Sequence, residues 1–323
     1  MALSETLPAL TAIVAIPDQY ATVAQTIEYL KKQTIVSEIQ IVLVVPSRVA
    51  VPIPLTDLEM FHDVRVTKLP NLTYSHAMAH GIRHADAPVV AMTEDHAFPA
   101  PNWAERLVSA HQAPHAVVGP MMRNANPTSA VSWADFYIGY GKWAEPIASG
   151  EHDFLMAHNA AYKRDVLLEF GAALEEMMAS ETALHFELAH RKHTFWLEAT
   201  THTAHVNFDR WQPFIAAMFF SGRVFAGYRA WNWSWRKRAL YALAFPLIAL
   251  VRLVRIRRDV RRAAMPLRAR LALYGAIALG LFADALGQGI GYAMGRRHWD
   301  LHSEKFEFHR AETLKRKLSS LTE

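Results

Sequence analysis

The chain has 323 residues, of which 52% are hydrophobic and 20% charged, with a formal net charge of +4 at pH 7. This apolar content excludes a disordered chain, and the length fits one large α/β domain with an appendage, or two domains. The absence of cysteine excludes a disulfide scaffold, a thiolate zinc site and a cysteine nucleophile. The start of the chain lacks a basic segment and a small-residue cleavage site, so it predicts no secretory signal.

Short apolar runs alternate with segments of helical spacing through residues 10–118. Residues 10–16 and 39–45 are apolar runs that each end at or just before a proline, as buried strands do. Further strands are predicted at 64–69, 88–92 and 116–118, and helices at 19–34, at 75–84 with Ser75 as the N-cap, and at 103–112. This alternation predicts an α/β fold in which a mostly parallel sheet is covered by helices on both faces.

Polar residues that directly follow strands are candidates for a site, because ligands of such sheets bind beyond the carboxyl ends of the strands. They are Asp18, Ser47 and, above all, the run Thr93, Glu94, Asp95 and His96. Two adjacent carboxylates there suit Mg²⁺ or Mn²⁺ bridging phosphates, since hard cations prefer oxygen ligands. The alternative is a solvated acidic turn without a ligand. His96 either orients the Asp95 carboxylate or is a partly solvated loop residue.

Charge divides the chain near Ser221. Residues 1–221 contain 14 Lys and Arg against 23 Asp and Glu, a net charge of −9, whereas residues 222–323 contain 20 against 7, a net charge of +13. We therefore expect two domains, 1–221 and 222–323, with different roles. The basic region interleaves its arginines with long apolar runs, which favours a membrane surface with anionic lipids as its partner rather than nucleic acid.

Three features of the basic region support a membrane partner. Trp231, Trp233 and Trp235 precede Arg236–Arg238, as aromatic and basic anchors at the headgroup level do. Residues 239–251 are apolar but too short to cross a bilayer, and Pro246 interrupts them. Next, arginines recur at three- and four-residue steps, which predicts a basic amphipathic helix. These arginines are Arg252, Arg255, Arg258 and Arg262, and the apolar residues expected opposite them are Val254, Ile256 and Val260.

Residues 271–295 are long enough to cross a bilayer but contain Asp284 and Gln288, which are costly at its centre. Arginines on both flanks, at 268 and 270 and at 296 and 297, predict a re-entrant or peripheral path at the cytoplasmic face rather than a crossing. The alternative is a helical subdomain packed on the rest of the chain, or a dimer interface.

Four stretches resemble family 2 glycosyltransferases, which have the GT-A fold. Residues 13–34 resemble the opening strand and helix, and residues 87–110 resemble the strand that carries the Asp-x-Asp metal motif. Residues 154–171 contain a match to the Asn-Ala-Ala-Phe-Arg-Arg core at Asn159–Arg164, and residues 180–207 resemble the segment with the catalytic acid and a downstream histidine. The resemblance implies that 1–221 is a catalytic domain that binds a nucleotide-sugar.

The resemblance also implies roles for single residues. Asp95 matches the last Asp of Asp-x-Asp, which coordinates the metal ion on the donor diphosphate, and Thr93 replaces the first Asp. His205 matches the histidine that completes the metal and diphosphate site, with His202 as the alternative. Glu181 matches the general base of inverting members. The implied donor-binding residues are Pro17, Asp18, Glu94, Asp95 and Asn159. Pro46 and Ser47 stand where the family commonly has Asp residues that contact the nucleotide.

The implied activity is a metal-dependent, inverting transfer of a sugar from a nucleotide-sugar to an acceptor hydroxyl, with Mg²⁺ or Mn²⁺ as cofactor. A lipid-linked acceptor would explain anchoring at the cytoplasmic face of the membrane. The alternative function is that of a degenerate, non-catalytic binding or scaffold protein, because Thr93 is no acid and no Asp follows the second strand.

Histidine clusters offer competing metal sites. His185 and His190 lie five residues apart, about 140° around a helix, so they cannot bind one zinc ion as a metalloprotease helix does. His76, His80 and His84 share a helix face, for which a polar surface or donor contacts are sufficient explanations.

Overall fold

The computed structural model describes residues 7–156, 158–179, 181–262, 265–295, 308 and 310–314. The chain divides into two compact units, Met1–Met121 with Ala148–Thr203, and Met122–Ile147 with Ala204–Glu323. Ser221, where the charge changes, lies inside helix α8 (Trp211–Arg229), and its use as a domain boundary stays a prediction.

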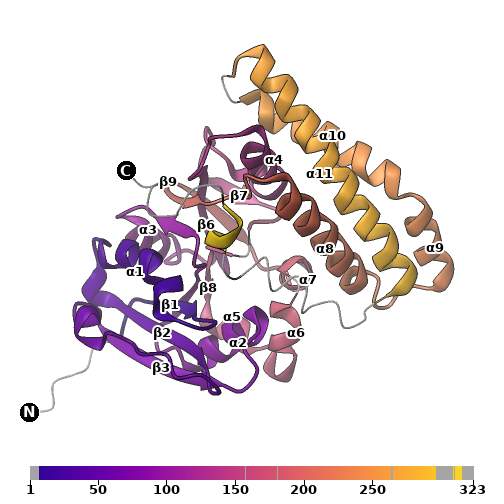
Figure 1. Ribbon diagram of the computed structural model, residues 1–323. Helices are drawn as coiled ribbons and strands as arrows, with labels where there is room; N and C mark the ends of the chain where they lie inside the picture. Colours follow the sequence, from indigo (N-terminus) through magenta and orange to yellow (C-terminus); the bar gives the residue numbers. More distant parts are fainter. Residues whose placement is uncertain are drawn as a thin grey trace, which may run out of the picture. The chain divides into compact units, whose positions relative to one another are not determined.

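A nine-stranded sheet forms the centre of the first unit, and β6 and β9 end in the second (Figure 1). The strand order is β3-β2-β1-β4-β8-β6-β9-β5, and β7 pairs with β9. The strands are β1 (Leu10–Ala15), β2 (Ile39–Pro46), β3 (Asp63–Leu69), β4 (Val89–Met92), β5 (Ala97–Pro99), β6 (Val117–Asn124), β7 (Gly150–His152), β8 (Ala161–Lys163) and β9 (Phe195–His205).

The sheet is parallel from β3 through β2 and β1 to β4, which confirms the α/β prediction. Beyond β4 it is mixed, because β8 runs antiparallel to both β4 and β6. The hydrophobic pattern did not indicate β5, β7, β8 or β9. The first three of these have only three residues each, which is too short to show a hydrophobic period.

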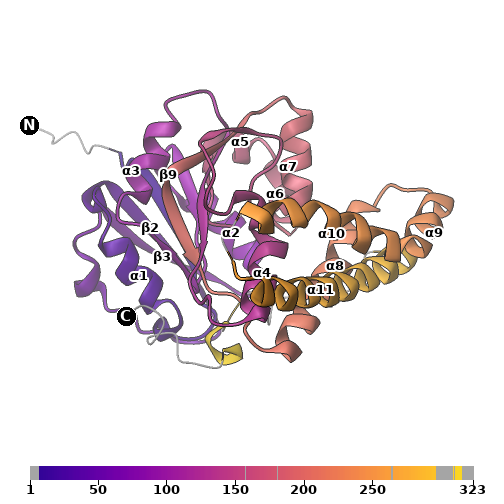
Figure 2. The same ribbon diagram turned by 90° about the horizontal axis from the view of Figure 1, so that it is seen from above.

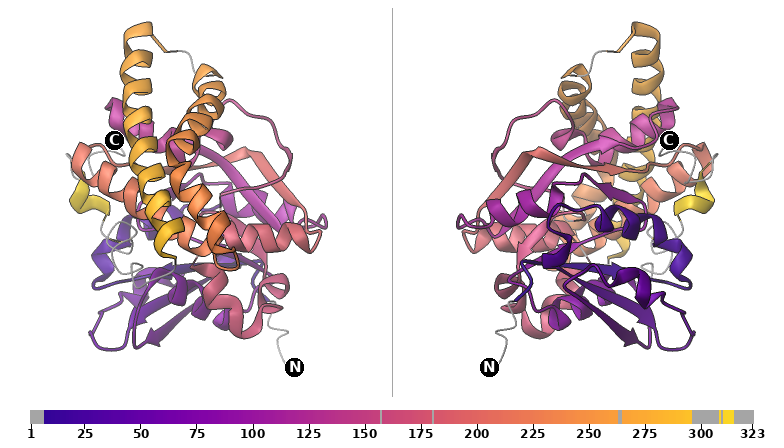
Figure 3. Two further views of the ribbon diagram at one scale, coloured as in Figure 1. Left: turned by 90° about the vertical axis from the view of Figure 1, so that its right-hand side faces the viewer. Right: turned by 90° about the vertical axis from the view of Figure 1, so that its left-hand side faces the viewer.

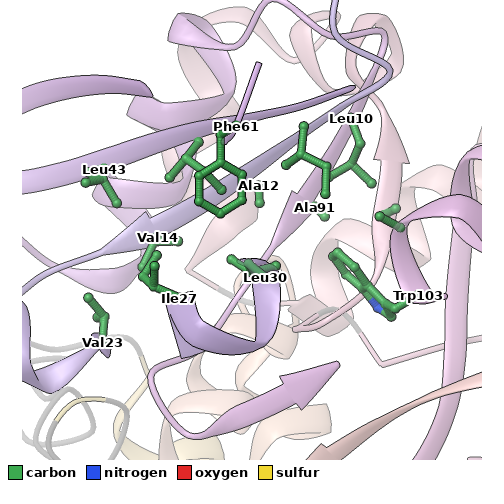
Figure 4. Packing of buried hydrophobic residues seen from close by; sticks show 14 of the residues in the cluster. Leu10, Ala12, Val14, Val23, Ile27, Leu30, Leu43, Phe61, Ala91 and Trp103 are labelled. Atoms are coloured by element: carbon green, nitrogen blue, oxygen red, sulfur yellow. The ribbon is translucent and has the colours of Figure 1, made fainter. Parts of the chain in front are cut away.

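Helices cover both faces of the parallel strands, as the sequence predicted. Alternate residues of β1 and β2 pack against α1 and α3, and Figure 4 shows this core around Ile27, Leu30 and Trp103. The opposite face meets α2, where Gly81 lies against Ile13. The helices of this unit are α1 (Ala24–Lys31), α2 (Tyr74–His84), α3 (Trp103–Ala110), α5 (Arg164–Leu168), α6 (Leu174–Met178) and α7 (Glu181–His190).

Helix boundaries differ from the expected ones where side chains form local hydrogen bonds. The predicted N-cap of α2, Ser75, lies inside the helix, and Thr73 is the cap because its Oγ1 accepts a hydrogen bond from the backbone N–H of His76 at 3.2 Å. The helix expected at 19–34 is shorter: a 3₁₀ turn over Tyr20–Thr22 precedes α1.

Helix α7 places its two histidines in different environments. His185 is buried, with Nε2 2.9 Å from the Tyr162 hydroxyl, whereas His190 is exposed. The two side chains therefore differ in burial, and the prediction that they share no ion stays a prediction. Burial lowers the pKa of His185 to about 3.

The second unit is mostly helical, and Figures 2 and 3 show α10 and α11 side by side. Its helices are α4 (Ala130–Gly139), α8 (Trp211–Arg229), α9 (Trp235–Leu243), α10 (Phe245–Arg262) and α11 (Leu267–Met294). Glycines let α8 and α11 pack closely, since a Cβ at Gly222 would lie 2.1 Å from the Asp284 carbonyl oxygen and one at Gly287 would lie 2.0 Å from that of Phe219.

The outer face of α10 is not arranged as the sequence suggested. Ile256 and Val260 are buried as expected, but Val254 is 59% exposed. Arg252 turns inward and pairs with Asp284, whose Oδ2 also accepts a hydrogen bond from Gln288 Nε2 at 2.8 Å. Val254 is only two residues from Ile256, which places the two side chains about 200° apart on a helix. Arg296 and Arg297 lie outside the described residues.

Gly81→Ala should destabilise the chain, because the new Cβ would lie 2.3 Å from Ile13 Cγ2. Overpacking of this kind costs about 1–3 kcal/mol and exceeds the roughly 1 kcal/mol gained in helix propensity. Gly275→Ala in α11, with open space around its Cβ, is the matched control and should not destabilise. Equal melting temperatures of the two variants would contradict the described packing of α2 on β1.

Acid should destabilise the chain through His185, because its folded pKa of about 3 lies below the unfolded value of about 6.5. The unfolded chain then binds the extra proton, so stability falls as the pH decreases below 6.5. Between pH 7.5 and pH 5, this histidine lowers the free energy of unfolding by about 2 kcal/mol. Chemical denaturation of His185→Gln should show a shallower decrease over this range. An unchanged pH dependence in the variant would contradict the burial of this imidazole.

Candidate functional site

The four residues that follow β4 are all buried, although three of them are ionisable. The exposed fraction is 5% for Thr93 and Glu94, 8% for Asp95 and 0% for His96. The Thr93 hydroxyl donates a hydrogen bond to the backbone carbonyl of Ile13 at 2.8 Å. Thr93 thus joins the end of β4 to β1, at the position where the family motif has its first Asp.

Glu94 is held at several points in the first unit. Its Oε1 lies 2.6 Å from His158 Nδ1, and its Oε2 accepts a hydrogen bond from Asn159 Nδ2 at 2.5 Å. The Thr26 hydroxyl of α1 donates to the backbone carbonyl of Glu94 at 2.9 Å. A buried carboxylate needs such partners, since an unpaired one costs several kcal/mol. The described geometry is therefore a constrained site and not a solvated acidic turn.

Asp95 and His96 form a pair in which the Asp95 carboxylate is hydrogen-bonded to Nδ1 of the imidazole. This bond fixes the ring, and Nε2 lies 3.8 Å from Glu94 Oε1. Ligand bonds of about 2.0–2.2 Å allow two atoms bound to one cation to lie up to about 4.4 Å apart. Glu94 Oε1 and His96 Nε2 thus fit a divalent cation, with Asp95 as the carboxylate that orients the imidazole.

Asn159 connects this cluster to the strand before it. Its backbone has a φ of 64°, in the left-handed region that asparagine tolerates better than most residues. Its N–H donates to the Met92 carbonyl at 2.9 Å, and its side chain reaches Glu94. The Asn159 assignment as a donor-binding residue stays a prediction, but the residue lies at the cluster.

The strands beside β4 end in the polar residues that the sequence singled out. Asp18 follows Pro17 beyond β1, and its Oδ1 accepts hydrogen bonds from the Gln19 N–H at 2.7 Å and the Thr22 hydroxyl at 2.9 Å. Ser47 follows β2 and is exposed. Because β2, β1 and β4 are adjacent and parallel, their carboxyl ends lie at the same edge of the sheet, and the residues that follow them lie there too.

Glu181 and the downstream histidines lie on other elements. Glu181 is the first residue of α7, and its side chain lies outside the described part of the chain. His202 is partly exposed on β9. His205 ends β9 in the second unit, where it is buried and its Nδ1 lies 3.0 Å from Asn207 Oδ1. The catalytic role of Glu181 and the metal role of His205 stay predictions.

The sequence did not single out His158 or Tyr74, whose rings stack with centroids 4.4 Å apart. His158 could have been found from its position in the sequence, because it directly precedes Asn159. On the surface of α2, the rings of His80 and His84 lie 4.1 Å apart. Burial and the neighbouring His84 lower the pKa of His80. His76 is exposed and the other two are partly exposed, in agreement with a polar helix face.

The fold is similar to that of known glycosyltransferases. A mannosyltransferase from Pyrobaculum calidifontis, solved with GDP-Man and Mn²⁺, matches 88% of this chain and 87% of its own chain with 14% identity and a TM-score of 0.52. GalNAc-T7, solved with UDP, GalNAc and Mn²⁺, matches 73% of this chain with 11% identity and a TM-score of 0.47. TarS from S. aureus matches 86% with 12% identity and a TM-score of 0.44.

The chain spans about half the length of these last two proteins, 51% and 54% respectively. No curated protein matches the chain by sequence. The family model for glycosyl transferase family 2 matches residues 11–171, which contain the parallel strands, the run from Thr93 to His96, and Asn159. The fold, the position of the buried carboxylates and this match agree, and the chain belongs to glycosyl transferase family 2.

Proposed function

We propose that this protein transfers a sugar from a nucleotide-sugar donor to an acceptor hydroxyl with inversion at the anomeric carbon, and that it needs a divalent cation. Family membership supports glycosyl transfer in general. The observation that carries the finer proposal is the buried cluster of Glu94, Asp95 and His96 at the carboxyl end of β4. A bound cation would neutralise the charge that develops on the diphosphate leaving group.

We further propose that Glu94 and His96 are the ligands from the first unit. The Asp95 carboxylate holds His96 at Nδ1, which leaves Nε2 as the ligand atom. His205 is held in the same way, because Asn207 contacts its Nδ1, and the family resemblance implies a metal role for it. Imidazole ligands suit transition metals, whereas Mg²⁺ prefers oxygen, so this set favours Mn²⁺.

The remaining roles in the proposal come from the resemblance. Glu181 takes the proton from the acceptor hydroxyl, which attacks the anomeric carbon from the face opposite the leaving diphosphate. A single displacement of this kind inverts the anomeric configuration and needs one base. Pro17, Asp18 and Asn159 bind the donor, and their positions at or near the edge shared by β1 and β4 support this role.

We propose that the second unit associates with the cytoplasmic face of a membrane and brings a lipid-linked acceptor to the site. Among the described residues, one helix, α11, is both long enough and apolar enough to cross a bilayer. Large apolar side chains of α9–α11 are exposed, among them Leu243 at 82% and Leu271 at 63%. The net charge of +13 over residues 222–323 favours anionic lipids.

A non-catalytic binding protein is the second candidate function, and Thr93 is the observation that favours it. The Thr93 hydroxyl donates a hydrogen bond to the Ile13 carbonyl, so this position has no carboxylate that could bind a cation. The two candidates differ in their response to Mn²⁺, since a scaffold without a cation site would bind a nucleotide-sugar equally well in EDTA. Calorimetry of donor binding with and without Mn²⁺ therefore separates them.

His96→Ala should weaken Mn²⁺ binding by more than about tenfold, since it removes a ligand atom, and Asp95→Asn should weaken it by about 10–100-fold, since it removes the group that orients the imidazole. Isothermal titration with Mn²⁺ alone measures both. His84→Ala, at the surface of α2, is the control and should bind normally. If Asp95→Asn abolishes binding and His96→Ala does not, Asp95 is the ligand, as the resemblance alone implies.

Glu181→Gln should lower kcat by about 10²–10⁴-fold while donor affinity stays unchanged, because a positioned base acts on the acceptor. Glu187→Gln, on the same helix, is the control, since its carboxylate pairs with Arg191 at 2.9 Å. A loss of donor binding in Glu181→Gln would assign this residue to the donor site instead.

A further inference from the structure

The second unit has an apolar corner where α9 meets α10. The two helices are bent by 63° at a short break after Leu243, and Figure 2 shows α9 at one end of the helical unit, with α10 leading away from it. Large apolar side chains of the corner are strongly exposed. We define the apolar corner as Leu240, Leu243, Leu247, Leu250, Val251 and Val254, with exposed fractions of 64%, 82%, 59%, 56%, 41% and 59%.

The exposed residues of α10 form one stripe. Positions 247, 250, 251 and 254 follow the spacing of a single helix face, within about 100° of one another. The opposite face carries Ile256 and Val260, which are buried in the unit. The helix is therefore apolar toward the interior and, over its first half, also toward the outside. A soluble surface helix would carry polar residues on that outer face.

Basic residues flank the apolar corner on both sides. Arg236 and Lys237 are exposed at the start of α9, next to Trp235, which is 73% exposed. The second half of α10 exposes Arg255, Arg257, Arg258 and Arg261. From Trp235 to Arg262 the chain contains nine Lys and Arg against one acid, Asp259. Anionic headgroups complement this pattern, with the tryptophan at their level and the leucines below them.

The lengths of the two helices fix how deep the corner can enter. Lys237 and Leu243 are six residues apart, which is about 9 Å along a helix. Leu247 and Arg255 are eight residues apart, which is about 12 Å. With the basic residues at the headgroups, the leucines reach the boundary of the acyl chains, about 5–10 Å deep. The hydrocarbon core is about 30 Å thick. The two helices together are apolar enough for either a broken span or a re-entrant loop, and these short, bent lengths favour a corner that dips into one leaflet.

The contacts of α11 show why the longest helix need not cross. Gly222 and Gly287 bring α8 and α11 into backbone contact, and Asp284 and Gln288 lie buried within the unit, where Arg252 pairs with Asp284. A crossing α11 would have to break these contacts or take α8 and the ion pair with it into the hydrocarbon.

We propose that the apolar corner is the membrane-docking element, inserted in one leaflet of an anionic bilayer, and that α11 stays packed on α8. This inference rests on the proposed membrane association and specifies the surface and lipid chemistry that it uses. The proposed partner is a lipid bilayer. A second copy of this chain on the same corner is the alternative that the experiment must separate.

Flotation with vesicles of phosphatidylcholine, with and without phosphatidylglycerol, tests the proposal on the full chain. Binding should require the anionic lipid. Leu243→Glu combined with Leu247→Glu should weaken binding by about a hundredfold or more, since two leucine side chains no longer leave water. Leu55→Glu, at a residue of the first unit with a similar exposed fraction of 54%, is the control and should bind normally.

Basic residues are tested in the same assay. Arg255→Gln combined with Arg258→Gln should weaken binding by roughly thirtyfold, because each basic residue near an anionic surface strengthens binding by a factor of about five to six. Arg48→Gln, exposed in the first unit, is the control. The chain has no cysteine, so Leu243→Cys gives a single site for an environment-sensitive fluorophore. Its emission should shift to the blue on vesicles, and that of Leu55→Cys should not.

Three results would overturn the proposal. The first is vesicle binding by the doubly substituted corner equal to that of the unmodified chain. The second is retention of the chain in membranes after carbonate extraction, which indicates a crossing helix. The third is conversion of a dimer to a monomer by the corner substitutions with vesicle binding unchanged. Donor binding by calorimetry in the same preparations reports on the first unit, so a failed docking surface is distinguished from a failed enzymatic function.

Discussion

The site depends on how a buried carboxylate at the end of a strand is compensated. Glu94 is 5% exposed, and a charge in such a place is stable only when its oxygens have partners. His158 and Asn159 supply them from a segment more than 60 residues away, and Thr26 of α1 binds the backbone carbonyl. One residue, through its side chain and its backbone carbonyl, therefore joins three separate parts of the chain around the carboxyl end of β4.

The same constraint shapes the chemistry of the site. An imidazole beside a carboxylate, with its Nδ1 bound to a second carboxylate, presents a nitrogen ligand in a fixed direction. Thr93, which carries no charge, stabilises the strand end through Ile13. The site thus combines few free rotations with mixed oxygen and nitrogen donors, and both properties favour a cation that accepts imidazole.

The helical unit is a folded segment that is both apolar and basic, and it still exposes leucine side chains. Glycines bring α8 and α11 together, and Asp284 and Gln288 are buried in this unit, where the partly exposed Arg252 pairs with Asp284. The polar groups of α11 are thereby satisfied inside the protein. The first half of α10 keeps an apolar face outward, which a purely soluble helix would not need.

The sequence by itself determined the parallel strands β1 to β4, the helices α1 to α3 that cover them and the position of the acidic cluster, because hydrophobic period and proline punctuation are local properties. It also gave the angle of about 140° between His185 and His190, which follows from helix geometry. Tertiary structure decided the rest. The three-residue strand β8, the Thr73 cap, the outward turn of Val254 and the inward turn of Arg252 depend on neighbours distant in sequence. The same holds for Glu94, whose partners His158 and Asn159 become visible only when the sheet places them beside β4, because a hydrogen bond between distant segments leaves no periodic trace in the sequence.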